Sequence, residues 1–261
     1  PRMDERVTYV GHATVLLEVG GARMLTDPIL RGRVAHLRRH GGAVDHGSLG
    51  ELDAVLVSHA HLDHLHAGSL KPLARADAQP VLIVPPGARR HVAKLGFADV
   101  REIGAGESTE VAGVEVAATP AVHDGRRHPL GPSGEAVGFR VGPPGRRVYF
   151  AGDTDIFGAM ADLADGLDLA LVPVWGWGPS LGPGHLDPEA AAEALRLLRP
   201  RVAVPIHWGT LFPFVLDLVR GKAGLLTDPP HRFAERASRL TPEVEVRVLR
   251  PGEATPLPPP R

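Results

Sequence analysis

The residues best suited to chemistry lie in one short segment, Ser58-His59-Ala60-His61-Leu62-Asp63-His64, which holds three histidines and one aspartate. It directly follows the apolar run Ala54-Val55-Leu56-Val57, which is typical of a buried strand. Side chains alternate along an extended chain, so His59 and His61 can contact one cation from the same side. Asp63 and His64 can then reach a second cation nearby, the arrangement that a two-metal hydrolase needs. Solvated loop histidines are the alternative, and the spacing argues against them.

Three more candidate ligands each stand where a predicted strand ends: His123, Asp153 and His207. Strand ends that gather at one edge of a sheet are where α/β enzymes build their sites. Taken singly, each residue could be a solvated or capping side chain in a turn. Together with the first segment they predict a metal centre.

Four residues are candidates for substrate contact: His185, His12, Trp175 and Trp177. His185 precedes a helix whose N-terminal amides favour an anion such as phosphate, so it could bind substrate or deliver a proton. His12 follows a glycine between two strands and could also support the metal ligands from behind, or be a structural turn residue. The two tryptophans could wall an apolar pocket or simply pack against a sheet.

The composition limits the metal chemistry and the partners. The chain has 261 residues, of which 43% are hydrophobic, enough for a large core. Its formal charge of -1 predicts no binding to nucleic acid and leaves a small-molecule or lipid-like substrate. Cysteine is absent, so any metal must be held by nitrogen and oxygen. No apolar stretch approaches about 18 residues, so we expect no transmembrane segment and a cytoplasmic protein. The oligomeric state is not readable.

The elements that must position these residues follow from periodicity and turn signals. Strands are expected at 7–10, 14–19, 23–26, 53–57, 81–84, 114–119, 136–141, 147–151, 167–174, 202–206 and 244–249. Helices are expected at 65–76, 88–95 and 187–198. Residues 31–50 show no period and predict a long loop, either a lid or binding loop or a solvated basic one. The proline-rich tail from about residue 256 is expected to be flexible.

Strands followed by helices, twice over, predict an α/β fold with two mixed sheets and helices on their outer faces. We expect a single domain over residues 1–261. Roughly 100 residues separate the strand before His59 from the strand before Asp153, so a duplicated half-domain is compatible with this layout.

The chain also resembles the metallo-β-lactamase fold hydrolases. The resemblance is carried by His59-Ala60-His61-Leu62-Asp63-His64, His123, Gly152-Asp153-Thr154 and Pro205-Ile206-His207-Trp208-Gly209-Thr210. It implies a four-layer αββα sandwich. It also implies that His59, His61 and His123 bind a first metal, that Asp63, His64 and His207 bind a second, and that Asp153 bridges both.

Within that superfamily, further segments are similar to the branch that contains N-acyl-phosphatidylethanolamine-hydrolysing phospholipase D, and more distantly to ascorbate-6-phosphate lactonases. These segments are Gly11-His12-Ala13-Thr14-Val15, Leu25-Thr26-Asp27-Pro28-Ile29 and His185-Leu186-Asp187-Pro188-Glu189-Ala190. Two features depart from the phospholipase. The chain begins at the first strand of the shared core, without the region that helps form a lipid pocket there, and the loop at 175–184 differs, so we expect substrate choice to differ at that loop.

The leading hypothesis is a dinuclear metal-dependent hydrolase in which a metal-bridging hydroxide attacks a phosphodiester. Asp63, Asp153 and His185 are then the residues nearest the chemistry. A lactonase or another carboxylic ester hydrolase with the same centre is the first alternative. A non-catalytic metal-binding protein is the second, and the complete ligand set argues against it. Two divalent ions are expected, with Zn²⁺ favoured and Mn²⁺ or Fe²⁺ also compatible.

Overall fold

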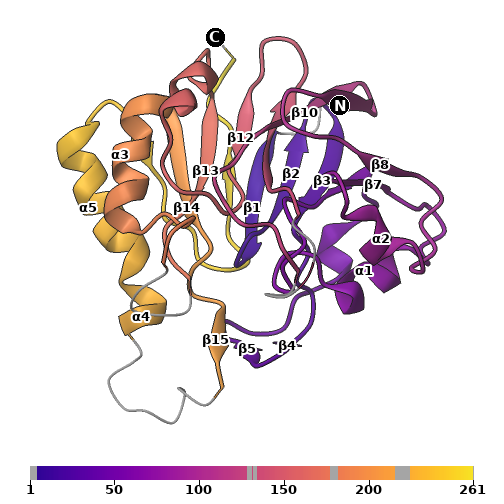
Figure 1. The fold of residues 1–261 in the computed structure, drawn as a ribbon. Helices are drawn as coiled ribbons and strands as arrows, with labels where there is room; N and C mark the ends of the chain where they lie inside the picture. Colours follow the sequence, from indigo (N-terminus) through magenta and orange to yellow (C-terminus); the bar gives the residue numbers. More distant parts are fainter. Residues whose placement is uncertain (1–4, 128–130, 132–133, 177–181, 215–223, 261) are drawn as a thin grey trace.

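Two seven-stranded sheets face each other in the computed structural model, which describes residues 5–127, 131, 134–176, 182–214 and 224–260 (Figure 1). The first sheet has the order β17-β1-β2-β3-β6-β7-β8. Its strands are β1 (Arg6–Gly11), β2 (Thr14–Val19), β3 (Ala22–Thr26), β6 (Ala54–Leu56), β7 (Val81–Val84), β8 (Val100–Glu102) and β17 (Ala254–Pro256). Pairing is antiparallel from β17 to β3 and parallel from β3 to β8, so the sheet is mixed.

The second sheet has the order β16-β14-β13-β12-β11-β10-β9. Its strands are β9 (Ser108–Val111), β10 (Val114–Pro120), β11 (Val137–Gly142), β12 (Val148–Phe150), β13 (Leu169–Pro173), β14 (Val202–Ile206) and β16 (Glu245–Val246). It is antiparallel from β9 to β12 and parallel from β12 to β16. Both sheets are therefore mixed, as predicted.

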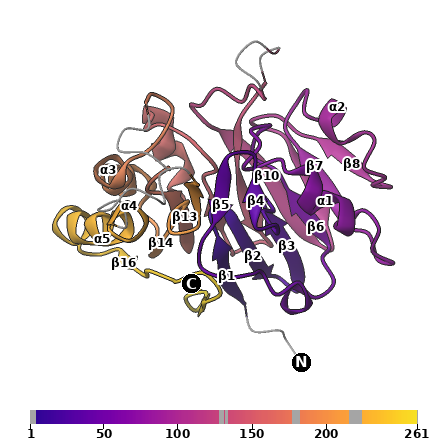
Figure 2. The same ribbon diagram turned by 90° about the horizontal axis from the view of Figure 1, so that it is seen from below.

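Helices cover the outer faces of the two sheets, which completes the expected four layers (Figure 2). On the first sheet they are α1 (Ala67–Leu73) and α2 (Arg89–Val92), and on the second α3 (Pro188–Leu198), α4 (Gly224–Thr227) and α5 (Pro229–Leu240), with the 3-10 helix η2 (Gly158–Leu163) beside α3. The main core lies between the sheets and includes Tyr9, Leu17, Phe139, Phe150 and Leu171, all fully buried. A second cluster packs under α1 and α2.

Two expectations about the chain between these elements were wrong. Residues 31–50 are not one structureless loop, because they hold β4 (Arg33–Val34), β5 (Leu37–Arg39) and the 3-10 helix η1 (Gly47–Leu49). β5 pairs with β4 and with β15 (Leu211–Pro213) in a small third sheet. The tail at residue 256 is not frayed, because Pro256 is paired with Arg6 of β1 and Leu257 is buried.

Candidate metal centre

The ends of several strands bring the predicted ligands to one place between the sheets. His59 and His61 follow β6, whose three apolar residues are all buried. His123 follows β10, Asp153 follows β12 and His207 follows β14. In the second sheet β12, β13 and β14 are parallel, so their carboxyl ends lie at the same edge.

Three imidazoles form a first cluster. The His61 Nδ1 lies 2.9 Å from His59 Nε2 and 3.1 Å from His123 Nε2. One nitrogen from each ring lies within 4.8 Å of the other two, so one cation could contact all three. His59 is fully buried, while His61 and His123 are half-buried and face a pocket.

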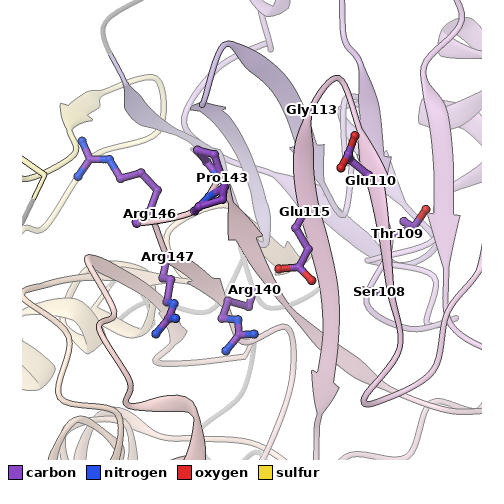
Figure 3. Close-up of a pocket in the computed structure, with 12 residues that line it drawn as sticks. Ser108, Thr109, Glu110, Gly113, Glu115, Arg140, Pro143, Arg146 and Arg147 are labelled. Carbon is purple, nitrogen blue, oxygen red and sulfur yellow. The ribbon is translucent and has the colours of Figure 1, made fainter.

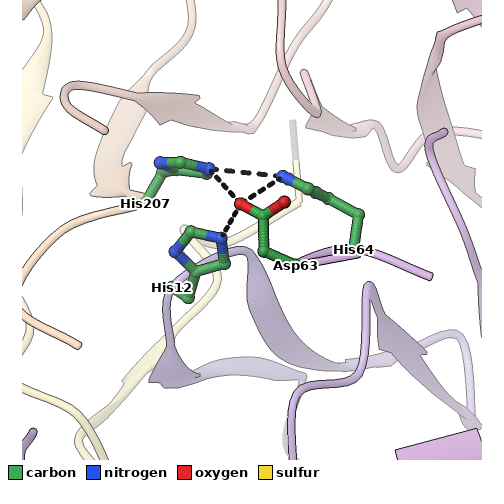
Figure 4. A group of neighbouring side chains, drawn as sticks. All are labelled: His12, Asp63, His64 and His207. Carbon is green, nitrogen blue, oxygen red and sulfur yellow. Dashed lines mark hydrogen bonds and ion pairs between the residues drawn. The ribbon is translucent and has the colours of Figure 1, made fainter. Parts of the chain in front are cut away.

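A second cluster combines Asp63, His64, His207 and His12 (Figure 4). Asp63 Oδ2 lies 3.7 Å from His64 Nε2 and 4.0 Å from His207 Nε2, and these two nitrogens are 3.3 Å apart. His12 Nε2 is 3.1 Å from the same Asp63 oxygen. One carboxylate and two imidazoles therefore converge as predicted, and His12 joins them.

Asp153 lies within reach of both clusters. Its Oδ2 is 3.3 Å from His64 Nε2, and its Oδ1 is 3.3 Å from His207 Nε2. It also forms a group with His123 of the first cluster and with His185, whose Nε2 is 3.8 Å from Oδ2. Asp153 is 4% exposed, and its Oδ1 has no hydrogen-bond partner among the described residues. A buried carboxylate oxygen without a hydrogen bond is costly, and a bound cation would reduce that cost.

The electrostatics suit metal ligands. Burial lowers the pKa of His61 and of His207 to about 4, and it lowers the pKa of His59 as well, so these rings are neutral and can ligate. Burial alone would raise the pKa of Asp63, but the neighbouring His64 outweighs it and holds the value well below its usual range. Burial lowers the pKa of His64, yet the carboxylates, Asp153 first, raise it well above its ordinary value. These carboxylates attract positive charge that divalent ions could supply.

The family can now be assigned by comparison with known proteins. The model of the "Beta-lactamase superfamily domain" matches residues 22–208. The chain belongs to the metallo-β-lactamase superfamily. A "UPF0173 metal-dependent hydrolase" of Opitutus terrae is 35% identical over 256 residues, which cover 95% of this chain and 98% of that protein. This superfamily member therefore falls within a family of metal-dependent hydrolases.

Two further comparisons concern a phospholipase and a solved structure. The "N-acyl-phosphatidylethanolamine-hydrolyzing phospholipase D 1" of Caenorhabditis elegans is 31% identical over 226 residues, which cover 78% of this chain and 63% of that protein. Igni18, a metallo hydrolase from Ignicoccus hospitalis, has a TM-score of 0.73 at 24% identity and covers 97% of this chain and 98% of its own. At that identity the likeness supports the metallo-β-lactamase fold alone.

Backbone carbonyls orient two histidines of the centre through their outer nitrogens. The Nδ1 of His123 lies 2.8 Å from the Gly184 carbonyl oxygen, and the Nδ1 of His207 contacts the Trp175 carbonyl oxygen. Nδ1–H donation to a carbonyl leaves Nε2 free to ligate, an arrangement common around protein-bound metals.

Asp27 contacts the candidate ligands, although the sequence analysis does not place it in the site. Its Oδ2 accepts hydrogen bonds from His64 Nδ1 at 2.7 Å and from the Ser58 hydroxyl at 2.6 Å, while Oδ1 accepts from the Ser58 amide. The Ser58 hydroxyl in turn lies 2.9 Å from His59 Nδ1. One buried carboxylate thus supports a histidine of each cluster. The available signal was the segment around Asp27, which we used only for the resemblance.

A pocket of about 520 Å³ opens beside the two clusters. It is lined by Val34, Ala35, His36, Leu37, His61, Leu62, Asp63, His123, Asp124, Arg126, Arg127, Pro183 and His185. His185 therefore lies where substrate contact was predicted, and residues 34–37 belong to the segment for which a binding loop was one expectation. Arg127 donates from Nη1 to the carbonyl oxygens of Ala60 and Leu65, at the two ends of the ligand turn.

Two substrate candidates lie elsewhere, and one falls outside the described residues. Trp175 is buried and stacks on Phe212, so its ring packs in the core instead of lining this pocket. His12 is 2% exposed, is not among the lining residues of this pocket and contacts Asp63. Trp177 lies outside the residues that the structure describes.

A second pocket, of about 530 Å³, lies over β9, β10 and β11, away from the candidate metal ligands (Figure 3). Two of its arginines have structural partners: Arg146 pairs with Glu5, and Arg147 pairs with Asp165. None of the candidate metal ligands lines it. The pocket beside the histidine clusters is therefore the better candidate for catalysis.

Proposed function

We propose that the two clusters hold two divalent metal ions and that the protein uses them to hydrolyse a phosphodiester. One observation carries the proposal: the buried Asp153 carboxylate lies within reach of both clusters and has an oxygen without a hydrogen-bond partner among the described residues. His59, His61 and His123 would hold one ion. Asp63, His64 and His207 would hold the other, and Asp153 would be shared.

Zn²⁺ is the ion we propose, because neutral imidazoles and carboxylates suit it and the chain has no thiolate ligand. When bound, a pair of such ions supplies Lewis acidity and lowers the pKa of a bound water toward neutrality. The protein's own contribution is a fixed set of ligand nitrogens, oriented by the Asp27 carboxylate and by backbone carbonyls.

His185 is the residue we propose for handling a proton or a substrate oxygen. Its side chain is 28% exposed and lines the pocket, and its Nε2 is 3.8 Å from Asp153 Oδ2. Its Nδ1 is buried without a hydrogen-bond partner among the described residues. It stands just before α3, where Asp187 caps the helix by accepting from the Ala190 amide. An imidazole so placed could donate a proton to a leaving alkoxide.

An anionic substrate fits the pocket better than a neutral ester. Arg126, Arg127 and His36 lie among its lining residues, whereas Asp63 and Asp124 are its only carboxylates among the described residues. Asp63 would be engaged by metal, and Asp124 and Arg126 offset each other as an ion pair, so the excess positive charge rests on Arg127. Apolar side chains such as Leu62 add a surface for an organic substituent. The similarity to a phospholipase D over 78% of this chain supports the same choice.

The test compares bis-p-nitrophenyl phosphate with a panel of lactones, each with and without chelator. We expect chelator-sensitive phosphodiester turnover. Lactone turnover without phosphodiester turnover would favour the lactonase alternative instead. Elemental analysis of the purified protein reports the identity and number of the ions.

Asp153→Ala tests the shared carboxylate. We expect the bound metal to fall below that of the unaltered protein and turnover to fall by at least about 10²-fold, because both ions lose a ligand. Thermal unfolding of the variant in the presence of chelator controls for folding. Normal metal content and turnover would refute the bridging role.

A further inference from the structure

His12 occupies a position between two candidate ligands that come from opposite halves of the fold. It lies in the turn between β1 and β2 of the first sheet, whereas His207 follows β14 of the second. The His12 and His207 rings have centroids 3.8 Å apart, and His12 Nε2 reaches Asp63 Oδ2 at 3.1 Å (Figure 4). His12 is therefore the side chain through which the β1–β2 turn contacts the second cluster.

The backbone of His12 is also held by specific contacts. His12 has φ +58, a left-handed conformation that is uncommon for a residue other than glycine. The His207 amide donates to the His12 carbonyl at 2.7 Å, and the His12 amide donates to the Thr210 hydroxyl at 2.9 Å. A Cβ on the preceding Gly11 would lie only 2.7 Å from that hydroxyl oxygen. The β1–β2 turn and the segment at Thr210 are therefore too close for any side chain larger than that of glycine at position 11.

The contact with Asp63 identifies what the His12 side chain can do. A metal-binding carboxylate is ionised and can only accept hydrogen bonds, so the proton in this contact belongs to His12 Nε2. A ring nitrogen that carries a proton has no lone pair for a cation. His12 can thus hold Asp63 in place through Nε2–H. The same nitrogen cannot at the same time bind a metal ion.

We propose that His12 is a positioning residue for the second metal ion, holding Asp63 through its Nε2–H and the His207 main chain through its carbonyl oxygen. This inference rests on the proposed function, since it concerns the same centre. The first cluster has no such link, because His59, His61 and His123 do not contact His12 by a hydrogen bond in the part of the chain described. Loss of His12 should therefore affect the two ions unequally.

The experiment measures Zn²⁺ affinity and stoichiometry by chelator competition in the unaltered protein, His12→Ala and His12→Gln. We expect His12→Ala to bind one of the two ions roughly 10- to 100-fold less tightly, as for other residues that orient ligands, with the other ion unchanged. His12→Gln should recover most of the affinity, because its amide can donate from nearly the same place but is a poor zinc ligand. Both variants carry a Cβ at this left-handed position, so backbone strain is matched.

The outcomes separate the possible roles of His12. Equal losses in His12→Ala and His12→Gln would make His12 a metal ligand, and full affinity in His12→Ala would give it no role; either result overturns the proposal. An unaltered protein that binds no metal would refute the proposed function itself, and the inference with it. Should His12→Ala fail to fold, His12→Gln alone must still keep both ions.

A double-mutant cycle adds a readout that general destabilisation would not reproduce. If His12 acts through Asp63, then Asp63→Ala and His12→Ala/Asp63→Ala should bind the ion that His12→Ala weakens with affinities within about threefold of each other, because coupled residues are not additive. Independent, additive losses in the double variant would contradict positioning through Asp63.

Discussion

Asp27 is the residue that links the two clusters through hydrogen bonds rather than through metal. It is fully buried, and its two oxygens accept from the Ser58 amide, the Ser58 hydroxyl and His64 Nδ1. Because the Ser58 hydroxyl donates to Asp27, it can accept from His59 Nδ1. Both histidines are thereby held with Nε2 directed away from this carboxylate, toward the candidate metal positions.

We therefore predict that Asp27→Asn weakens metal binding in both clusters. The amide presents an N–H₂ group to at least one donor that the carboxylate satisfied, so His64 or Ser58 loses its orientation. Zn²⁺ affinity measured by chelator competition should fall by about 10- to 100-fold at each site.

Asp53→Asn is the matched control for that substitution. Asp53 precedes β6 and accepts from the Arg23 amide at 2.7 Å, with no contact to either cluster in the described part of the chain. It should keep full Zn²⁺ affinity. An Asp27→Asn protein that binds Zn²⁺ as tightly as the unaltered protein would show that this carboxylate does not support the centre.

At the residue scale, local spacing predicts the candidate ligands better than it predicts the residues that hydrogen-bond to them. His59, His61, Asp63 and His64 are close in the chain just after β6, so their local spacing was enough to group them. Asp27 reaches them only because β3 pairs with β6 in parallel. His12 depends on contacts with Thr210 and His207, nearly 200 residues away, which no local pattern contains.

At the scale of elements, β4 and β5, which lie in the segment that the sequence predicts to be a loop, build one wall of the pocket. Val34 and Leu37 of β4 and β5 pack with Ile29 and Leu211 in a small apolar cluster, and Leu62 of the ligand turn packs against it. β5 pairs with β15, which follows His207 by a few residues. The wall is thus attached to both sides of the metal centre.

We predict that Leu37→Ala raises KM for the substrate while leaving metal content unchanged. Truncating a buried leucine in so small a cluster loosens the pocket wall, at a cost of about 2–5 kcal/mol in packing, without removing a ligand. KM should rise several-fold with a smaller change in kcat, measured with whichever ester the protein hydrolyses.

Leu240→Ala serves as the comparison for that measurement, because Leu240 ends α5 and packs against the main core away from the pocket lining. It should reduce stability without changing KM. If Leu37→Ala and Leu240→Ala had the same KM, β4 and β5 would have no role in substrate binding.

Four short strands that the sequence does not predict, β4, β5, β8 and β9, lack a local signal. β8 and β9 are short and partly exposed, with burial patterns that carry no apolar run. β4 and β5 have two and three residues and owe their existence to pairing with each other and with β15. α5 differs, since Asp228-Pro229 repeats the Asp187-Pro188 start of α3, and buried Phe233 and Ala237 stand one turn apart. That signal was present and was overlooked.

At the scale of the whole molecule, the two sheets are joined by the tail as well as by the core between them. β17 pairs with β1 at the edge of the first sheet, and Leu257 is buried against the main core. Three arginines from around β12, β14 and β16 of the second sheet bind backbone carbonyls of the tail. These bonds run from Arg146 to Pro258, from Arg201 to Pro259 and from Arg247 to Pro256.

The prediction that the tail would be flexible rested on its proline content, and proline content was the wrong guide. Proline lacks an amide donor but keeps its carbonyl, and the carbonyls of three tail prolines accept from arginines. The two-sheet architecture was predictable because alternation of strands and helices is a local signal. The attachment of the tail was not, since Arg146 lies 112 residues and Arg201 lies 58 residues from the carbonyl that each binds, and the paired strand β1 lies at the other end of the chain.

We therefore predict that deleting residues 254–261 lowers the unfolding temperature of the whole protein without emptying the metal centre. The deletion removes β17, exposes the core that Leu257 covers and leaves Arg146 and Arg201 without their carbonyl partners. Burial of one leucine contributes about 1.5–3 kcal/mol, and a chain of this size loses about 2–4 °C per kcal/mol, so a shift of about 5–10 °C is expected by calorimetry.

Leu257→Ala, which keeps the backbone bonds, should give a smaller shift in the same direction. Zn²⁺ affinity should stay unchanged in both variants, because no hydrogen bond or ion pair joins a candidate ligand to the tail in the part of the chain that the structure describes. A deletion variant that unfolds at the temperature of the unaltered protein would show that the core between the sheets holds the two sheets together without the tail.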